Sequence, residues 1–329
     1  MVQVLCLAVP VLTAAVLVAA CQTSASPVIR VDGSSTVYPL TEAVAEDYLR
    51  VTPGARITVG VAGTGGGFKR FCRGEIEIAN ASRPIGPTEQ ADCDASGVGF
   101  LEIPVAYDGI TVVVHLRNDW VMDLSVEELG RLWRHEAEGQ VLRWSDLRAG
   151  FPTREIRLYG AGVDSGTFDY FTEAVTGTAR DSRGDYTSSE DDNTLVQGVA
   201  GDLGALGFFG FAYFDENRTR LRAVPIRPTQ EAPAVAPTVE SIRAGTYRPL
   251  SRPIFIYVSA AAFTRKDVQA FVAFYLSHAD TLAREVGYVP LSDETAEQVL
   301  GRVRARTHGS LYDDEILAGR TLDERLRAQ

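Results

Sequence analysis

Three short turns place hydroxyl-bearing or glycine residues directly before an expected helix: Ser34-Ser35-Thr36, Gly65-Gly66-Gly67 and Ser165-Gly166-Thr167. The first turn of a helix has free backbone N–H groups and carries about half a positive charge from the aligned peptide dipoles. Helix ends of this kind bind oxyanions, and nearby hydroxyls add donors. Each turn alone is also typical of an ordinary helix cap. Three of them, each following an expected strand, favour an anion site.

Other phosphate-binding and catalytic motifs do not match these residues. The glycine run continues as Phe68-Lys69-Arg70, so it lacks the Gly-Lys-Ser/Thr ending of a P-loop and the Gly-x-Gly-x-x-Gly of a dinucleotide site. Ser165 lies in no Gly-x-Ser-x-Gly elbow, and its motif contains no histidine. His135-Glu136 lacks the second histidine of a zinc protease. We therefore expect a binding protein with no catalytic residue, metal or cofactor.

Strands and helices alternate along the chain, which is typical of a parallel sheet covered by helices. Strands are expected at 28–31, 57–59, 76–79, 110–114, 156–159 and 253–258, and helices at 68–73, 266–276 and 295–304. A further helix is expected from the apolar spacing of Leu40, Val44, Tyr48 and Val51, ending at Pro53-Gly54.

The strongly apolar runs 110–114 and 253–258 are expected to cross between two lobes. We predict a hinged α/β protein in which each lobe is a central sheet flanked by helices and the hinge lies at 112–114 and 254–258. Lobe 1 would comprise 28–112 and 256–329, and lobe 2 would comprise 113–255. Ligands of such sheets bind outside the carboxyl ends of the strands, where the three turns fall.

The composition limits the class of ligand. The chain has 329 residues, 45% of them hydrophobic, and a formal net charge of −11. This acidity argues against a nucleic-acid partner, because binding a phosphate backbone needs clustered cations. A small enclosed anion remains compatible, since a few oriented amides and one or two guanidinium groups can hold it locally.

The first twenty residues are nearly all small or apolar and end in Val18-Ala19-Ala20 before Cys21. This is typical of an export signal and too short to indicate a membrane span. We expect a signal peptide at 1–20 and a polar tether at 21–27. The signal resembles that of bacterial lipoproteins, in which this cysteine carries the lipid; an ordinary signal peptide is the alternative. Either way we expect an exported protein, at the outer face of the membrane or in the periplasm.

Two cysteines remain once Cys6, in the signal, and Cys21, the candidate anchor, are set aside. Cys72 and Cys93 are expected to form a disulfide in an oxidising compartment, and two buried free thiols are the alternative. Metal ligation is not expected, because the four histidines show no suitable spacing to these cysteines.

The chain also resembles a known family over nearly all of its mature length. The stretch 29–40, Ala81-Ser82-Arg83-Pro84-Ile85 and the stretch 164–171 are similar to the PstS-type substrate-binding proteins of phosphate-specific ABC importers. Glu190-Asp191-Asp192-Asn193 and Asp108-Gly109 fit as well. The resemblance implies a type-II periplasmic-binding fold, inorganic phosphate as ligand, and delivery to a membrane permease with a cytoplasmic ATPase. We expect a monomer.

The resemblance also assigns residues to the anion. Three groups would contact it from different sides, with several weaker candidates: Ser34, Ser35 and Thr36 from one side, Ser82 at the middle, Ser165, Gly166 and Thr167 from the opposite lobe, and Gly65, Gly66 and Asn193 as further candidates.

This sequence departs from one branch of the family at two positions. Arg83 stands where that branch has an aspartate, and Ala161 stands where it has an arginine. We therefore expect that the site cation has moved to Arg83. The alternative is that Arg83 pairs with surface carboxylates.

With that aspartate absent, another carboxylate would have to accept the proton that distinguishes hydrogen phosphate from sulfate. Asp164 is the first candidate and Asp108 the second. Asp164 could instead cap its helix. Three rival functions stay open: a binder of sulfate, molybdate or a phosphonate, a secreted phosphatase acting through Ser165, and a sensor or adhesin without a transporter.

Overall fold

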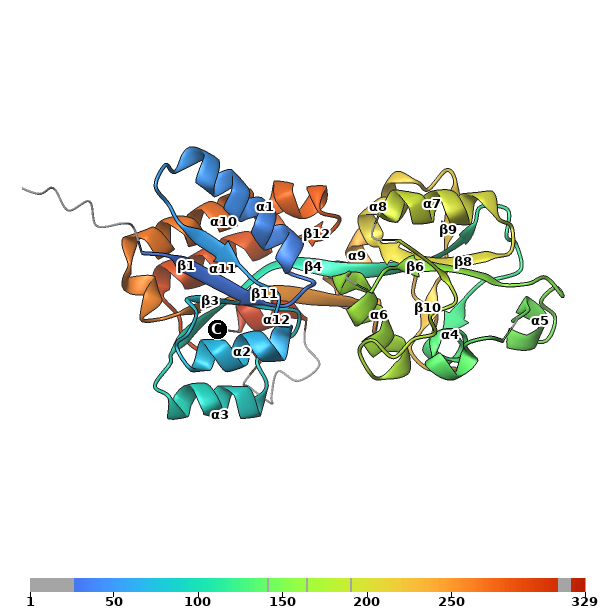
Figure 1. Cartoon of the computed structure of the whole chain (residues 1–329), viewed down its shortest axis with the longest axis horizontal. Helices are drawn as coiled ribbons and strands as arrows, with labels where there is room; N and C mark the ends of the chain where they lie inside the picture. The colour runs from blue at the N-terminus through green and yellow to red at the C-terminus, as the bar shows by residue number, and fades with distance from the viewer. Residues whose placement is uncertain (1–26, 141, 164, 190, 313–320, 329) are drawn as a thin grey trace, which may run out of the picture.

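The computed structural model describes residues 27–140, 142–163, 165–189, 191–312 and 321–328. Two lobes lie side by side and are connected by the long strands β4 (Phe100–His115) and β11 (Ser251–Ser259) (Figure 1). Each lobe has a central sheet with helices against it, which confirms the predicted two-lobed α/β fold. No helix in these described ranges is both long and apolar enough to cross a bilayer.

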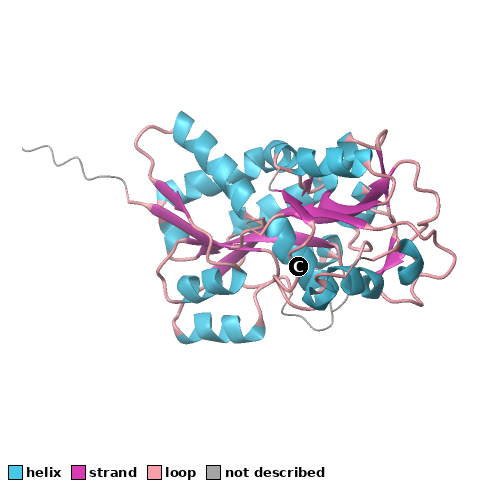
Figure 2. Ribbon diagram, turned by 45° about the vertical axis from the view of Figure 1, so that its right-hand side comes forward, coloured by secondary structure: helices cyan, strands magenta, loops and turns pink. Residues whose placement is uncertain are grey.

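Lobe 1 has sheet strands covered on both faces by helices (Figure 2). Its first elements in chain order are β1 (Ile29–Gly33), α1 (Tyr38–Val51), β2 (Ile57–Val59), α2 (Thr64–Cys72), β3 (Ile78–Ala81) and α3 (Pro87–Ala95). After β11 the chain returns with a 3-10 turn at Ala262–Thr264, then α10 (Lys266–Glu285), β12 (Val289–Pro290), α11 (Asp293–Ala305) and α12 (Leu322–Arg327).

Lobe 2 is formed by the chain between β4 and β11. Its elements are β5 (Leu124–Ser125), α4 (Val126–Trp133), a 3-10 turn at His135–Ala137, α5 (Trp144–Leu147), β6 (Arg157–Ala161), α6 (Gly166–Thr176), β7 (Thr187–Ser189), α7 (Asp192–Gly201), β8 (Ala205–Gly210), α8 (Phe211–Glu216), β9 (Leu221–Ala223), β10 (Ile226–Arg227) and α9 (Val239–Arg243).

One sheet runs through both lobes in the order β2-β1-β3-β11-β4-β8-β6-β7. β2, β1 and β3 are parallel, whereas β11 is antiparallel to β3 and β4. β4 pairs with β11 up to Gly109 and with β8 from Ile110 onward, so it changes lobes at this point. The predicted lobe boundaries and hinge segments remain predictions.

Two helices differ from the sequence-based expectation. α10 continues to Glu285, nine residues beyond the predicted end at Leu276, because its buried residues keep helical spacing through Ala283. α2 begins at Thr64, so the glycine run forms its first turn instead of a loop before it. A β-carbon on Gly67 would lie 2.6 Å from the Cα of Gly33, and only glycine permits this close crossing of helix and strand.

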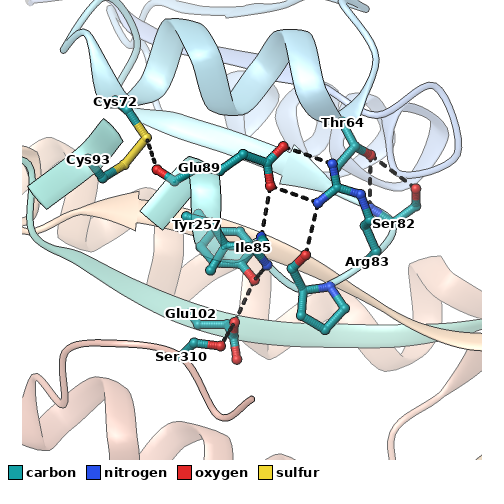
Figure 3. A network of polar contacts seen from close by, with 12 residues as sticks. Thr64, Cys72, Ser82, Arg83, Ile85, Glu89, Cys93, Glu102, Tyr257 and Ser310 are labelled. Carbon is teal, nitrogen blue, oxygen red and sulfur yellow. Dashed lines mark hydrogen bonds and ion pairs between the residues drawn. A yellow bond between two sulfur atoms is a disulfide. The ribbon is translucent and has the colours of Figure 1, made fainter. Parts of the chain in front are cut away.

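A separate hydrophobic cluster lies beneath α2 and α3. It includes Phe68, Phe71 and Tyr257, together with both disulfide cysteines. Cys72 ends α2, Cys93 lies in α3, and their sulfur atoms are bonded, as predicted. The disulfide therefore joins the two helices on this side of lobe 1 (Figure 3).

The first prediction concerns this bond. Replacing both Cys72 and Cys93 with serine should lower the free energy of unfolding by about 3 kcal/mol, because the bond closes a loop of about 20 residues in the unfolded chain. Urea denaturation of parent and variant measures the difference. Equal unfolding free energies in the oxidised parent and the variant would contradict it.

Candidate functional site

A cavity of about 260 Å³ lies where the two lobes meet. The residues that line it lie at the starts of α1 and α2, just after β3, in or just after α6, and on β11. They are Ser34, Ser35, Thr36, Gly63, Thr64, Gly65, Ser82, Arg83, Asp169, Tyr170, Glu173, Ala179 and Arg252. The predicted residues that the structure brings together here are Ser34, Ser35, Thr36, Gly65, Ser82 and Arg83.

Parallel pairing of β1 with β3 positions the lobe 1 hydroxyls. Gly33 and Asn80 are opposite each other at the strand ends, and the backbone N–H of Ser34 donates to the Asn80 carbonyl at 2.9 Å. Thr64, which the sequence analysis missed, lies beside Ser82. The two hydroxyl oxygens are 3.0 Å apart, and the Ser82 N–H donates to Thr64 Oγ1 at 3.2 Å. Hydroxyl groups from α2 and β3 thus meet at one edge of the sheet.

Helix α6 supplies the lobe 2 wall. Asp169 and Glu173, one turn apart on this helix, both line the cavity. The Ser35 hydroxyl donates to Asp169 Oδ2 at 3.2 Å across the lobes, and Arg180 Nε donates to Asp169 Oδ1 at 2.9 Å. Both carboxylate oxygens of Asp169 therefore accept a hydrogen bond. Asp169 was not among the predicted site residues.

The two lobes touch directly at Gly166. Thr36 Oγ1 donates to the Gly166 carbonyl at 3.3 Å. A β-carbon on Gly166 would lie 2.5 Å from the Thr36 Cα, so a side chain here would force the lobes apart. This close approach gives a physical reason for glycine in the Ser165-Gly166-Thr167 motif.

The other predicted residues that the structure describes lie outside this lining. Ser165 caps α6 by accepting the Thr167 N–H at 3.2 Å, next to the Gly166 contact. Asn193 is exposed near the start of α7, and Gly66 lies in the first turn of α2. Asp164 is outside the described residues. The roles of these residues therefore remain predictions.

Arg83 is one of the residues that line the cavity, and Figure 3 shows its polar contacts. Its Nη1 and Nη2 donate to the two carboxylate oxygens of Glu89 at 2.8 Å each. These hydrogen bonds raise the pKa of Arg83 above its ordinary value. The side chain lines the cavity and also pairs with a carboxylate, so both interpretations of Arg83 have a structural basis.

Arg252, on β11, is a second cavity cation that the sequence analysis missed. Its guanidinium carbon lies 3.5 Å from the centroid of the Tyr170 ring, and its Nη2 donates to Thr36 Oγ1 at 3.2 Å. Nη1 is 3.7 Å from Glu173 Oε2. The side chain is only 16% exposed. One sequence signal existed: an arginine directly before the apolar crossing strand.

Asp108 is opposite Arg252 in the pairing of β4 with β11. Its carboxylate is buried, and Oδ2 has no hydrogen-bond partner within the described chain; the nearest cation atom is Arg252 Nε at 3.9 Å. Burial raises the pKa of Asp108 to about 6, and the charge of Arg252 counteracts this only in part. Asp108 therefore lies behind Arg252 and not in the cavity wall.

A larger hollow of about 410 Å³ lies in lobe 2 beside α4 and α5. Arg131, Arg134 and Arg143 line it, but it contains none of the predicted site residues. We place the functional site in the inter-lobe cavity, because hydroxyls from several elements and two guanidinium groups converge there. Within the described ranges, no group of three or more His, Cys, Asp and Glu side chains could hold a metal ion.

Comparisons with known proteins agree with this fold. A family model described as PBP superfamily domain matches residues 20–279. The protein SphX of Synechococcus elongatus is 45% identical over 301 residues, which cover 92% of this chain and 88% of that protein. The phosphate-binding protein PstS of Staphylococcus saprophyticus is 32% identical over 275 residues, which cover 82% of this chain and 83% of that protein.

A solved structure is similar as well. The crystal structure of a possible phosphate binding protein from Planctomyces limnophilus has a TM-score of 0.82 and 44% identity, covering 86% of this chain and all of that one. These matches define a class of two-lobed substrate-binding proteins. Within that class, the chain belongs to the PstS-type family.

The second prediction follows from the burial of Asp108. Its pKa is raised to about 6 in the folded protein from 3.8, so the unfolded chain loses this proton first as the pH rises. The parent should therefore lose roughly 3 kcal/mol of stability between pH 3 and pH 7 relative to Asp108→Asn, at ~1.4 kcal/mol per pKa unit. Urea denaturation across this pH range measures it. Parallel stability curves for the two proteins would contradict it.

Proposed function

We propose that this protein captures inorganic phosphate in the cavity between its two lobes. The observation that carries the proposal is the convergence of Ser34-Ser35-Thr36, Ser82, Arg83 and Arg252 on one small cavity. Hydroxyls and guanidinium groups together provide the donors that a tetrahedral oxyanion needs, and enclosure strengthens each hydrogen bond. The names of the PstS-type relatives support the same ligand.

The carboxylates in the cavity favour a protonated oxyanion. An ionised carboxylate can accept a hydrogen bond from hydrogen phosphate, but it would face sulfate with only repulsion. Asp169 lines the cavity and therefore joins Asp164 as a candidate for this acceptor, whereas Asp108 lies behind Arg252.

Calorimetric titration of the protein, after removal of bound anions, tests the proposal. Phosphate should bind, and sulfate, molybdate and a phosphonate should bind more weakly. Tighter binding of one of these three would reassign the ligand. Turnover of a chromogenic phosphate ester that is lost in Ser165→Ala would instead indicate a phosphatase.

The third prediction concerns the two cavity cations. Arg83→Ala and Arg252→Ala should each weaken phosphate binding by about 1.5 to 3.5 orders of magnitude, because removing one partner of a buried charge pair costs roughly 2–5 kcal/mol. Arg83→Lys should fall between parent and alanine variant, since lysine keeps the charge but loses the planar fork. Calorimetry of each folded variant measures the effect.

Arg50→Ala is the matched control. Arg50 is exposed on α1 and pairs with Glu46 and Asp47 away from the cavity, so its loss should leave phosphate affinity unchanged. Parent-like affinity in Arg83→Ala or in Arg252→Ala would remove that arginine from the site.

We also propose that the mature protein is anchored at the outer face of the membrane through a lipid on Cys21. There it would act as a monomer that delivers phosphate to the permease and ATPase of an ABC importer. Cys21 and the preceding segment are outside the described residues, so this part rests on the sequence pattern and on the family.

The fourth prediction tests the anchor. Cys21→Ser should release the protein from membranes or leave the precursor uncut, because the lipid is attached to this thiol. Membrane fractionation and intact mass of the expressed protein measure it. Parent-like membrane association in the serine variant would contradict the lipoprotein assignment.

A further inference from the structure

The guanidinium group of Arg83 contacts the Glu89 carboxylate, the Pro84 carbonyl and the Phe68 ring, and Figure 3 shows the first two of these contacts. Nη1 and Nη2 hold the two oxygens of Glu89 at 2.8 Å, and Nη1 also donates to the Pro84 carbonyl at 3.1 Å. The guanidinium carbon lies 5.6 Å from the centroid of the Phe68 ring, within the range of a cation–π contact. An arginine side chain that is 43% exposed is therefore held in one plane.

This arrangement leaves one edge of the guanidinium group free. Arginine has five N–H donors in a rigid planar fork. Both hydrogens of Nη1 and one of Nη2 are used by Glu89 and Pro84. Within the described chain, Nε–H and the second Nη2–H of Arg83 have no protein acceptor. These two adjacent donors form the edge that binds two oxygens of one oxyanion.

Glu89 is itself held firmly. One of its oxygens accepts the backbone N–H of Gly86 at 2.8 Å, which caps the start of α3. Cys93 is one turn further along α3 and is bonded to Cys72 at the end of α2. The carbonyl oxygen of Glu89 lies 3.4 Å from Cys72 Sγ. The carboxylate therefore projects from a capped helix that is covalently attached to its neighbour.

The contacts close a ring around the cavity edge. α2 starts at Thr64, which is hydrogen-bonded to Ser82 in the cavity, and ends at the disulfide. From the disulfide, α3 leads back to Glu89, which holds Arg83, the residue after Ser82. Figure 3 shows this ring of hydrogen bonds and covalent bonds.

We propose that Glu89 is a positioning residue, which orients Arg83 so that its Nε–Nη2 edge faces the anion in the cavity. This inference rests on the proposed function, because it assumes that Arg83 binds phosphate. Glu89 is not among the cavity-lining residues, so it acts through Arg83. The disulfide supports the same arrangement by fixing the helix that carries Glu89.

Removing the charge of Glu89 has two opposing effects on the anion. It removes a negative charge from the neighbourhood, but that charge is already paired with Arg83 and is partly screened by solvent, because the Glu89 side chain is 21% exposed. It also releases Arg83 from its fixed plane. The side-chain amide nitrogen of the glutamine would face a guanidinium N–H of Arg83, and two donors cannot form a hydrogen bond with each other. The loss of orientation should dominate.

Calorimetric titration with inorganic phosphate of the mature, oxidised protein tests the inference through a double-mutant cycle. Glu89→Gln should weaken phosphate binding by about fivefold or more, a coupling typical of residues in direct contact. In the Arg83→Ala background, Glu89→Gln should have no further effect. Asp92→Asn is the matched control, because it removes one exposed carboxylate charge from the same helix, and it should leave affinity unchanged.

The outcomes are separable. If Glu89→Gln also weakens phosphate binding in the Arg83→Ala background, its effect is a general structural one, and the inference is overturned. Unchanged or tighter binding in Glu89→Gln alone would also overturn it. If the parent binds no phosphate, or if Arg83→Ala binds it as the parent does, the proposed function or its Arg83 contact fails instead. Thermal unfolding of each variant separates a loss of the α3 cap from a loss of binding.

Discussion

β4 pairs with β11 in an antiparallel ladder that extends from Phe100 and Ser259 to Gly109 and Ser251. The same β4 continues into lobe 2, where it pairs with β8. One sheet therefore spans both lobes, and the positions near this crossing lie beside the cavity. Arg252 and Asp108 are opposite each other here, which places a cation against the cavity and a carboxylate behind it. The lobes, the cavity and the charge of its inner wall all depend on this pairing.

Each cation of the cavity is matched by at least one carboxylate of the protein. Arg83 pairs with Glu89, and Arg252 lies near Asp108 and Glu173. Ser35 likewise donates to Asp169 from the opposite lobe. The net negative charge of this protein repels an anion at long range. An anion can therefore bind only where hydrogen-bond donors in the cavity are already oriented toward it. Pairing holds the donors in place and leaves part of their hydrogen-bonding capacity for the ligand.

The sequence predicted the fold, and it also indicated that several lobe 1 residues now found around one cavity would lie together, for a local reason. Ser34-Ser35-Thr36 and Ser82 follow strands that could be recognised, and parallel neighbours end at the same edge of a sheet. Arg252 could not be placed in this way. Its role depends on the register of β11 against β4, between strands more than a hundred residues apart, and no motif surrounds it. Thr64 could not be placed either, because its glycine-rich sequence predicts a loop, whereas these residues form the first turn of α2.

A crystal structure of the mature protein with phosphate would test the central claim most directly. The account predicts one anion in the inter-lobe cavity, with oxygens within hydrogen-bond distance of Ser34-Ser35-Thr36, the Nε–Nη2 edge of Arg83, and Arg252. An anion bound instead in the lobe 2 hollow beside Arg131 and Arg143, with the inter-lobe cavity empty, would contradict it.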